Sequence, residues 1–431
     1  MRNNGKKRYY RRFYFKLSLI TIVTVVSLSG LAINDFPSDV LPIGGIRASA
    51  TCPPIYLQYN SSLIGFANNT GGDGSSWALA VRIGDYIIDG GTTVEPLYIE
   101  DTDAFLVIEN CTLLNQGVFS NRGGITLINC SNVNITNCHG NNGTGSGIYL
   151  QECENITITG FTGWNNSDPG IQVISSTNVT LVNNTFYENH GAGMRVSFSV
   201  DVEVIDNNCS TNNQEGIDFS DCNNSLVYSN DIYQNNMAGI RLMSTNLTNV
   251  SGNTVFNNYI GIELSDSSTN NVSQNTITYG TYTGIFLMNA NGSTINDNVI
   301  DFNQGDGIQL MDANLNYILN NDINDNEILG IRLDLADYNV IHSNTIVSLN
   351  NGIDIHANCD INTITSNTIT YDSSTSQCIL DTGIGTIISG NTCIDIHPQD
   401  IPGYLGGFLL LFSMVGIFCV VLRLKMRYKL D

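Results

Sequence analysis

The segment Gly216–Leu242 has the sequence GIDFSDCNNSLVYSNDIYQNNMAGIRL and begins and ends with the same pattern, Gly-Ile-x-apolar. Its two copies start at Gly216 and Gly239, 23 residues apart. The pattern recurs at steps of 22 or 23 residues along most of the chain. A fixed period of this length is typical of solenoids and other repeat architectures. The copies begin at Gly124, Gly147, Gly170, Gly193, Gly216, Gly239, Gly261, Gly284, Gly307, Gly330 and Gly352.

Asparagine forms a second column with the same period. Two residues after each of these asparagines lies an apolar residue or a cysteine. Each repeat therefore holds three strands of about 3–5 residues with alternating positions. Strands this short bury their apolar faces only by stacking coil on coil, which predicts an all-β parallel β-helix of about twelve coils and three short sheets. The column consists of Asn184, Asn207, Asn230, Asn253, Asn275, Asn298, Asn321, Asn344, Asn367 and Asn391.

The repeated asparagines have a structural interpretation. Asparagine tolerates left-handed turns, and its side-chain amide pairs with turn backbone. In stacked coils each amide can also bond the next, so we expect an in-register ladder rather than a ligand site. We assign the repeat glycines to the turns.

Charge is distributed very unevenly along the chain. Residues 51–404 contain five arginines against 36 aspartates and glutamates, a net charge of −31, and no lysine occurs between Lys16 and Lys425. Such an acidic surface repels nucleic acid. We therefore expect no nucleic-acid partner.

Two apolar segments frame the acidic region. Residues 17–31 follow seven basic residues, which is the layout of a signal peptide or an N-terminal anchor. Residues 405–422 carry no charge, are long enough to span a bilayer as a helix, and precede a basic flank that should stay in the cytoplasm. We expect an exported ectodomain on a single-pass C-terminal membrane anchor in the cell membrane. The predicted parts are 1–50 (signal or anchor), 51–123 (cap and first irregular coils), 124–397 (repeats), 398–404 (linker), 405–422 (transmembrane helix) and 423–431 (cytoplasmic tail).

The 11 cysteines fit an oxidising exterior. Cys130 and Cys153 lie one coil apart, which brings their α-carbons within disulfide range. A disulfide and an inward stack of reduced cysteines are equally compatible with this spacing. Asn-x-Ser/Thr sequons also permit glycosylation, as in a glycoprotein.

The residue x of Gly-Ile-x-apolar points outward, because side chains alternate along a strand. Neighbouring coils bring these side chains within about 5 Å of one another, so this sheet face is the candidate binding surface. Its charges alternate in sign, which indicates either a self-neutralising ladder or a cleft in which arginines hold the carboxylates of an anionic sugar. The candidate ligand-binding residues are Arg195, Asp218, Arg241, Glu263, Phe286 and Gln309.

Other outward residues are candidates for catalysis or metal binding. His356 beside Asp334 could act as an acid–base pair, with Arg332 holding an anionic group and Asp354 alongside, or the four form an exposed polar patch. Calcium is the possible cofactor, but the acidic side chains that could bind it supply too few oxygen ligands for a complete calcium site. Stacked Met288 and Met311 suggest either a copper(I) site or apolar covering of the sheet. The calcium candidates are Asp218, Asp221, Glu263 and Asp266.

The repeats, with their Gly-Ile-x-Leu and Asn-Thr-Ile signatures, resemble right-handed parallel β-helix proteins of the pectate-lyase superfamily. They are most similar to the NosD-like, carbohydrate-binding and sugar-hydrolase branch. The segment Pro54–Gly117 resembles the entry cap of membrane-anchored archaeal members, and Ile401-Pro402-Gly403-Tyr404 with the apolar helix and basic tail resembles their anchor. This resemblance covers about residues 54–430 and implies a right-handed β-helix at the cell surface.

The resemblance leaves the activity open, because the family includes lyases, glycosidases, epimerases and a copper accessory factor. We expect a surface protein that binds glycans, a surface glycoprotein or another surface polymer, or that serves as a structural or adhesive spacer, and no enzyme. One alternative is a polysaccharide lyase, hydrolase or epimerase that uses the face around His356. A second alternative is a NosD-like accessory protein that handles copper or calcium.

Overall fold

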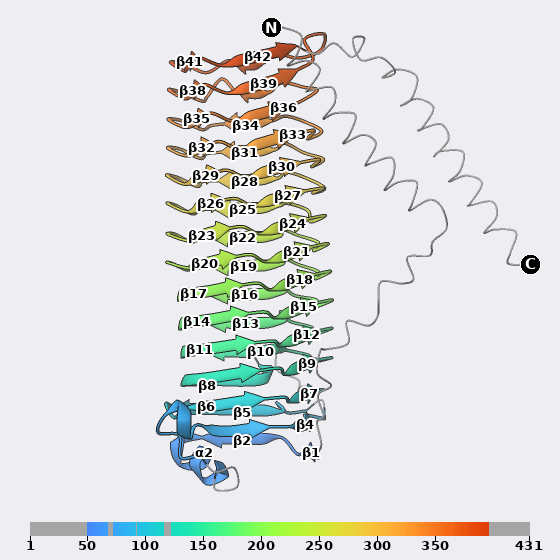
Figure 1. Ribbon diagram of the computed structural model, residues 1–431, viewed down its shortest axis with the longest axis vertical. Helices are drawn as coiled ribbons and strands as arrows, with labels where there is room; N and C mark the ends of the chain where they lie inside the picture. Colours follow the sequence, from blue (N-terminus) through green and yellow to red (C-terminus); the bar gives the residue numbers. More distant parts are fainter. Residues whose placement is uncertain (1–49, 68–71, 92, 116–121, 396–431) are drawn as a thin grey trace, which may run out of the picture. The chain divides into compact units, whose positions relative to one another are not determined.

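The computed structural model describes residues 50–67, 72–91, 93–115 and 122–395, which form a right-handed parallel β-solenoid (Figure 1). This confirms the expected fold. The chain divides into residues 1–47 and 48–431, and the described residues belong to the second unit. The predicted signal or anchor at 17–31 and the predicted membrane helix at 405–422 lie outside the described residues. Among the residues that are described, no helix is both long and apolar enough to cross a membrane.

Three parallel sheets run the length of the solenoid, and each coil contributes one short strand to each sheet. Sheet A has fifteen strands, more than the twelve coils expected, because the segment before Gly124 already follows the same stacking. Its strands are β1 (Ala50–Cys52), β4 (Tyr86–Asp89), β7 (Thr112–Leu114), β9 (His139–Asn141), β12 (Thr162–Trp164), β15 (Thr185–Tyr187), β18 (Asn208–Ser210), β21 (Asp231–Tyr233), β24 (Thr254–Phe256), β27 (Thr276–Thr278), β30 (Val299–Asp301), β33 (Asp322–Asn324), β36 (Thr345–Val347), β39 (Thr368–Tyr371) and β42 (Thr392–Asp395).

Sheet B contains all the strands of the Gly-Ile-x-apolar pattern, together with two strands before them and one after them. Its strands are β2 (Ile55–Gln58), β5 (Leu97–Thr102), β8 (Gly123–Thr136), β10 (Ser146–Gln151), β13 (Ile171–Ile174), β16 (Met194–Ser197), β19 (Ile217–Ser220), β22 (Ile240–Met243), β25 (Ile262–Ser265), β28 (Ile285–Met288), β31 (Ile308–Met311), β34 (Ile331–Asp334), β37 (Ile353–Ile355) and β40 (Ile379–Asp381).

Sheet C follows sheet B in each coil, and the long strand β8 bends from sheet B into sheet C. Its other strands are β3 (Val81–Gly84), β6 (Leu106–Glu109), β11 (Glu154–Thr159), β14 (Thr177–Val182), β17 (Val200–Ile205), β20 (Leu226–Tyr228), β23 (Asn249–Ser251), β26 (Asn271–Ser273), β29 (Thr294–Asn296), β32 (Tyr317–Leu319), β35 (Val340–His342), β38 (Thr363–Thr365) and β41 (Ile387–Ser389).

The apolar columns fill the interior of the coils. Ile300, Ile323 and Ile346 are stacked partners in sheet A, and all three are fully buried. The column asparagines also face inward. Each donates its side-chain N–H to the side-chain oxygen of the next asparagine at 2.9–3.0 Å, from Asn184 up to Asn391. Each also donates to a backbone carbonyl of the preceding coil, as Asn298 does to Val272.

The repeat glycines are required by packing and not by turn geometry, contrary to our assignment. Left-handed backbone occurs instead at other residues, such as Asp297 just before the ladder residue Asn298. A Cβ atom on Gly284 would lie 2.4 Å from Ile300 Cγ2 and 2.7 Å from the carbonyl oxygen of Gly307. The chain therefore passes from sheet A to sheet B through a space that admits only glycine.

The two ends of the described solenoid differ. Helix α2 (Tyr59–Ala67) packs on the first coil, where its Leu63 is fully buried in the core (Figure 1); the short 3-10 helix η1 (Trp77–Leu79) follows in the chain. At the other end, a disulfide joins Cys378 to Cys393 and closes the last described coil on itself, with its α-carbons 5.8 Å apart.

Of the two alternatives for Cys130 and Cys153, the structure has the inward stack of reduced cysteines and not the disulfide, because both residues are free, buried thiols. Cys130 donates to the carbonyl oxygens of Ile99 and Ile128 at 3.4 and 3.2 Å, and Cys153 makes the same kind of contact. In the next coil the serine hydroxyl of Ser176 has the equivalent role. The thiols therefore act as hydrogen-bonding groups in a column of small residues and are not joined by a disulfide.

Replacing one ladder residue should interrupt the solenoid locally. In Asn298→Leu, the backbone N–H of Asn275 and the carbonyl of Val272 lose their partners. We expect the free energy of unfolding to fall by on the order of 4 kcal/mol, because each unpaired buried polar group costs about 1–3 kcal/mol. Urea denaturation would measure this, with faster hydrogen exchange in the neighbouring coils. Asn271→Leu, on the outer face of sheet C, is the control, and an equal loss there would contradict a special role for the ladder.

Candidate functional site

The outer face of sheet B carries the predicted binding residues in one continuous column. Parallel pairing places each of them opposite the next in successive coils. Phe286 and the arginines are half-buried, whereas Gln309 is buried. In order along the solenoid the column consists of Arg195, Asp218, Arg241, Glu263, Phe286 and Gln309.

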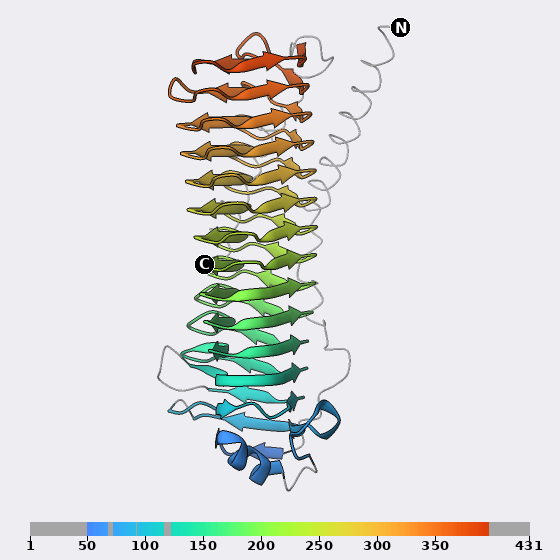
Figure 2. The same ribbon diagram turned by 90° about the vertical axis from the view of Figure 1, so that its left-hand side faces the viewer.

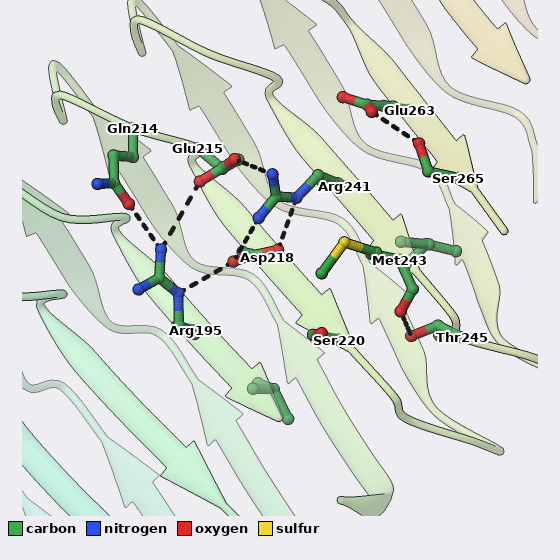
Figure 3. A network of polar contacts seen from close by, with 12 residues as sticks. Arg195, Gln214, Glu215, Asp218, Ser220, Arg241, Met243, Thr245, Glu263 and Ser265 are labelled. Atoms are coloured by element: carbon green, nitrogen blue, oxygen red, sulfur yellow. Dashed lines mark hydrogen bonds and ion pairs between the residues drawn. The ribbon is translucent and has the colours of Figure 1, made fainter. Parts of the chain in front are cut away.

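Asp218 lies at the centre of a charged network (Figure 3). It accepts hydrogen bonds from the Nε atoms of Arg195 and Arg241 at 3.0 and 2.9 Å, and a further one from Arg241 Nη2 at 3.0 Å. The Asp218 side chain is only 2% exposed. A buried carboxylate requires such partners, because an unpaired charge in the interior is costly.

Two further residues of the network, Gln214 and Glu215, were not predicted. Arg241 Nη1 lies 2.7 Å from Glu215 Oε1, and Arg195 Nη2 donates to Gln214 Oε1 at 2.6 Å. Burial raises the pKa of Glu215, and the negative charge of Asp218 raises it further, against the opposite influence of Arg241 and Arg195. Two carboxylates thus face two guanidinium groups, and the network is balanced in charge.

This balance corrects the simple alternation of charges that the sequence suggested. Glu263 accepts a hydrogen bond from Ser265 at 2.7 Å and not from either arginine of the network (Figure 3). Arg195 and Arg241 are occupied by the protein's own carboxylates. The geometry therefore favours the self-neutralising interpretation over a clamp for an anionic sugar.

The structure brings three of the four acid–base candidates together. The Nδ1 atom of His356 contacts Asp334 Oδ1, and its Nε2 atom lies 3.8 Å from Asp354 Oδ1. The imidazole is half-exposed, with 47% of its side chain accessible. A carboxylate on Nδ1 orients the ring and leaves Nε2 available for proton transfer, which is the geometry of an acid–base pair.

Arg332 turns away from this group toward a residue that was not predicted. Its Nε atom lies 3.0 Å from Asp306 Oδ2. Asp306 is 3% exposed, and burial raises its pKa to about 6 despite the positive charge of Arg332. Asp306 and Glu215 each stand immediately before a repeat glycine, and this position is the sequence signal that could have identified both of them.

The weak calcium candidates do not converge. Asp218 is enclosed by arginines, Asp221 accepts a hydrogen bond from Ser220, and Asp266 accepts one from Asn289. No group of three or more His, Cys, Asp or Glu side chains in the described part of the chain could hold a metal ion. The predicted set therefore does not form a cage, because its members are paired with other side chains.

The copper(I) candidates are stacked neighbours, as expected. Met288 pairs with Met311 on the outer face of sheet B, next to the outward Phe286. Two thioethers form an incomplete donor set, and the free cysteines at 111, 130, 138, 153, 209, 222 and 359 are buried. The residues described here thus fit apolar covering of the sheet better than a copper centre.

The raised pKa of Asp306 predicts a dependence of stability on pH. The folded protein holds this proton more tightly than an unfolded aspartate with a pKa of about 3.9. The contribution to stability is therefore complete below about pH 4 and is lost as the pH rises through about 6. Between these pH values the free energy of unfolding of the wild type should fall by on the order of 2–3 kcal/mol, at about 1.4 kcal/mol per pKa unit. Asp306→Asn should not show this loss. Urea unfolding at pH 4 and pH 7 would measure it. Asp231→Asn, on an exposed residue of sheet A, should follow the wild type, and an identical profile for Asp306→Asn would contradict the assignment.

Known proteins share both sequence and fold with this chain. Residues 84–260 and 236–395 match the family described as periplasmic copper-binding protein (NosD). The A-module of mannuronan C-5 epimerase AlgE6 from Azotobacter vinelandii is similar in structure, with a TM-score of 0.53 at 15% identity over 78% of this chain and 94% of that chain. A double mutant of the periplasmic alginate epimerase AlgG aligns over 80% of this chain and 85% of its own, with a TM-score of 0.43 at 13% identity.

At these identities the likeness to solved structures shows the fold alone. No curated protein sequence matches the chain. The two family matches together cover residues 84–395, which is well over half of the 431 residues. They include all of the strands that carry the acid–base and binding candidates, and the protein therefore belongs to the NosD family.

Proposed function

We propose that this protein is an exported β-helix that binds a neutral, hydroxyl-rich polysaccharide along the outer face of sheet B. The NosD family is described as periplasmic, which is consistent with a location outside the cytoplasm. The disulfide of the acidic solenoid is consistent with the same location. We also propose that residues 405–422 anchor it in the membrane, because they combine an uncharged stretch with a basic flank.

Unpaired hydrogen-bond acceptors on this face carry the proposal. Gln309 Oε1 and Thr283 Oγ1 are buried and have no hydrogen-bond partner among the described residues. Glu215 Oε2 lacks a hydrogen bond as well and lies 4.0 Å from Arg195. Buried acceptors normally find a donor in protein, water or ligand. Sugar hydroxyl groups are such donors, and a polymer that displaces the side chains covering these atoms would meet acceptors spaced along several coils.

The charges of the face determine which polymer fits. The arginines of the network are held by Asp218 and Glu215, so they do not offer free positive charge. The net charge of −31 over residues 51–404 repels polyanions. A neutral polysaccharide therefore fits better than a polyuronate, whatever the structural neighbours act on.

Gln309→Leu should weaken binding about tenfold, because loss of one hydrogen bond costs about 1–1.5 kcal/mol. Affinity electrophoresis through gels that contain a neutral glucan, a mannan or alginate would measure this. Thr294→Val, on the outer face of sheet C, is the control. Retention by alginate alone, or an equal effect of both variants, would contradict the proposed surface and its preference.

A polysaccharide-cleaving enzyme is the second candidate, and the contact between His356 and Asp334 favours it. An enzyme would show reducing ends or unsaturated products on incubation with the polymer that it binds. We expect no product from the wild type, since the guanidinium group of Arg332 is paired with Asp306 and is not available to bind a substrate. Product that is lost in His356→Ala, with polymer binding unchanged, would replace the binding function with catalysis.

A further inference from the structure

The type of residue at one turn position changes along the solenoid. The residue that begins sheet C in each coil has left-handed backbone, with φ between 52° and 58° in the coils from Asn132 to Asn224. In these five coils the position holds asparagine or aspartate, the side chains that tolerate this conformation. In the next three coils it holds Leu247, Thr269 and Gly292. It then holds Leu315, Tyr338 and Ile361 in three successive coils, at φ values of 60°, 56° and 57°. The five earlier residues are Asn132, Asn155, Asn178, Asp201 and Asn224.

These three residues are unfavourable for the fold in two ways. Leucine, tyrosine and above all β-branched isoleucine are strained in the left-handed region. Their side chains are also 57%, 51% and 47% exposed, so the strain is not offset by burial. Single exposed apolar residues also occupy left-handed turns elsewhere, as Leu247 does. These three differ because they stack in successive coils.

The three side chains belong to a larger exposed group, which we call the apolar patch. They lie in successive coils near the orange end of the solenoid, where β32, β35 and β38 stack (Figures 1 and 2). Ile384 and Ile387 continue it in the last described coil and are 71% and 58% exposed. The apolar patch comprises Leu315, Tyr317, Tyr338, Ile361, Ile384 and Ile387, all of them exposed.

Carboxylates beside the apolar patch limit what can cover it. Asp337 Oδ1 accepts the backbone N–H of Asp360 at 2.6 Å, and Asp360 Oδ1 accepts that of Ile384 at 3.1 Å. Both carboxylates are thus directed at backbone, and the apolar side chains stand outward. Their negative charge still disfavours an anionic surface and a second, equally acidic copy of this chain.

The position of the apolar patch in the chain identifies the occupant. Strand β42 ends at Asp395, and residues 396–404 separate it from the uncharged segment 405–422. Nine residues span at most about 30 Å, so a bilayer that holds this segment lies close to the end of the solenoid. Such tethering gives a high effective concentration, and a small apolar patch then suffices for docking. Exposed Ile, Leu and Tyr side chains are suited to the lipid–water interface.

We propose that the apolar patch docks the C-terminal end of the solenoid onto the surface of a neutral or zwitterionic bilayer. This inference rests on the proposed anchoring by residues 405–422. Docking would fix the orientation of the solenoid relative to the membrane. It would thereby also fix the direction in which the outer face of sheet B points. The strained turns are the cost of presenting apolar side chains at a position that holds asparagine or aspartate in the coils from Asn132 to Asn224.

Lipid contact is tested in the full-length protein reconstituted into phosphatidylcholine vesicles with brominated acyl chains. In Tyr338→Trp, we expect bromine to quench most of the added fluorescence. Leu247→Trp is the matched control, since Leu247 occupies the same left-handed turn position, is more exposed than Tyr338 (62% against 51%), and lies outside the apolar patch. Equal quenching at both positions overturns the proposal. So does shielding of the indole from acrylamide without bromine quenching, which would show that residues 405–422 or a second copy cover the apolar patch.

A second set of variants separates docking from folding. The triple variant Leu315→Asn, Tyr338→Asn and Ile361→Asn should raise the Tm by about 2 °C or more, because the strain is relieved. It should also lose the protection from hydrogen exchange that vesicles confer on these turns. Leu247→Asn should raise the Tm and leave that protection unchanged. A lower Tm in the triple variant means that the residues are structural, which overturns the proposal.

Flotation of the vesicles after alkaline extraction tests the anchor independently. If docking alone fails, the wild type floats while quenching and protection are absent. If anchoring fails, the wild type itself no longer floats, and the proposed function loses its membrane attachment. The two failures are therefore distinguishable in one preparation.

Discussion

The in-register hydrogen bond between stacked coils is the constraint on which the whole structure depends. Backbone ladders repeat it in three sheets, and the asparagine column repeats it inside the solenoid with side-chain amides. The amide is suited to this role because it donates to one neighbour and accepts from the other. A buried Asn that lacked either neighbour would be costly, so the column stabilises the solenoid only as a continuous stack.

This constraint explains why so many polar residues in the chain have no part in chemistry. Three more inward columns follow the same principle. One runs from Asn166 to Asn258, another joins Asn316, Asn339 and Asn362, and a third uses small hydroxyl and thiol side chains such as Ser176. What is left for function is the outward face of each sheet and the turns between sheets. On sheet B the charges largely pair with one another, and the uncommitted groups are unpaired acceptors such as Gln309 Oε1.

Prediction from the sequence succeeded for positions that recur in every coil, and it failed for contacts between individual side chains that occur only once. The strand positions of sheet B and the inward isoleucines followed from the period, because every coil repeats the same environment. Glu215 and Asp306 were missed because they lie before the glycine, outside the strand in which inward and outward side chains alternate. Cys378–Cys393 was missed for a related reason, since the last coil departs from the regular spacing. The glycines were assigned to turns, although a nearby isoleucine side chain is what excludes a Cβ atom.

The sequence by itself determined the parallel β-helix, its period, its outward sheet B column and the acidic character of its surface. Repetition makes these properties local, since each coil need only match the one before it. The tertiary structure decided which outward side chains are occupied. Asp218 binds two arginines, Arg332 turns to Asp306, and His356 approaches Asp334. Such pairing depends on side-chain directions and burial across several coils, and residue spacing along the chain does not specify either of them.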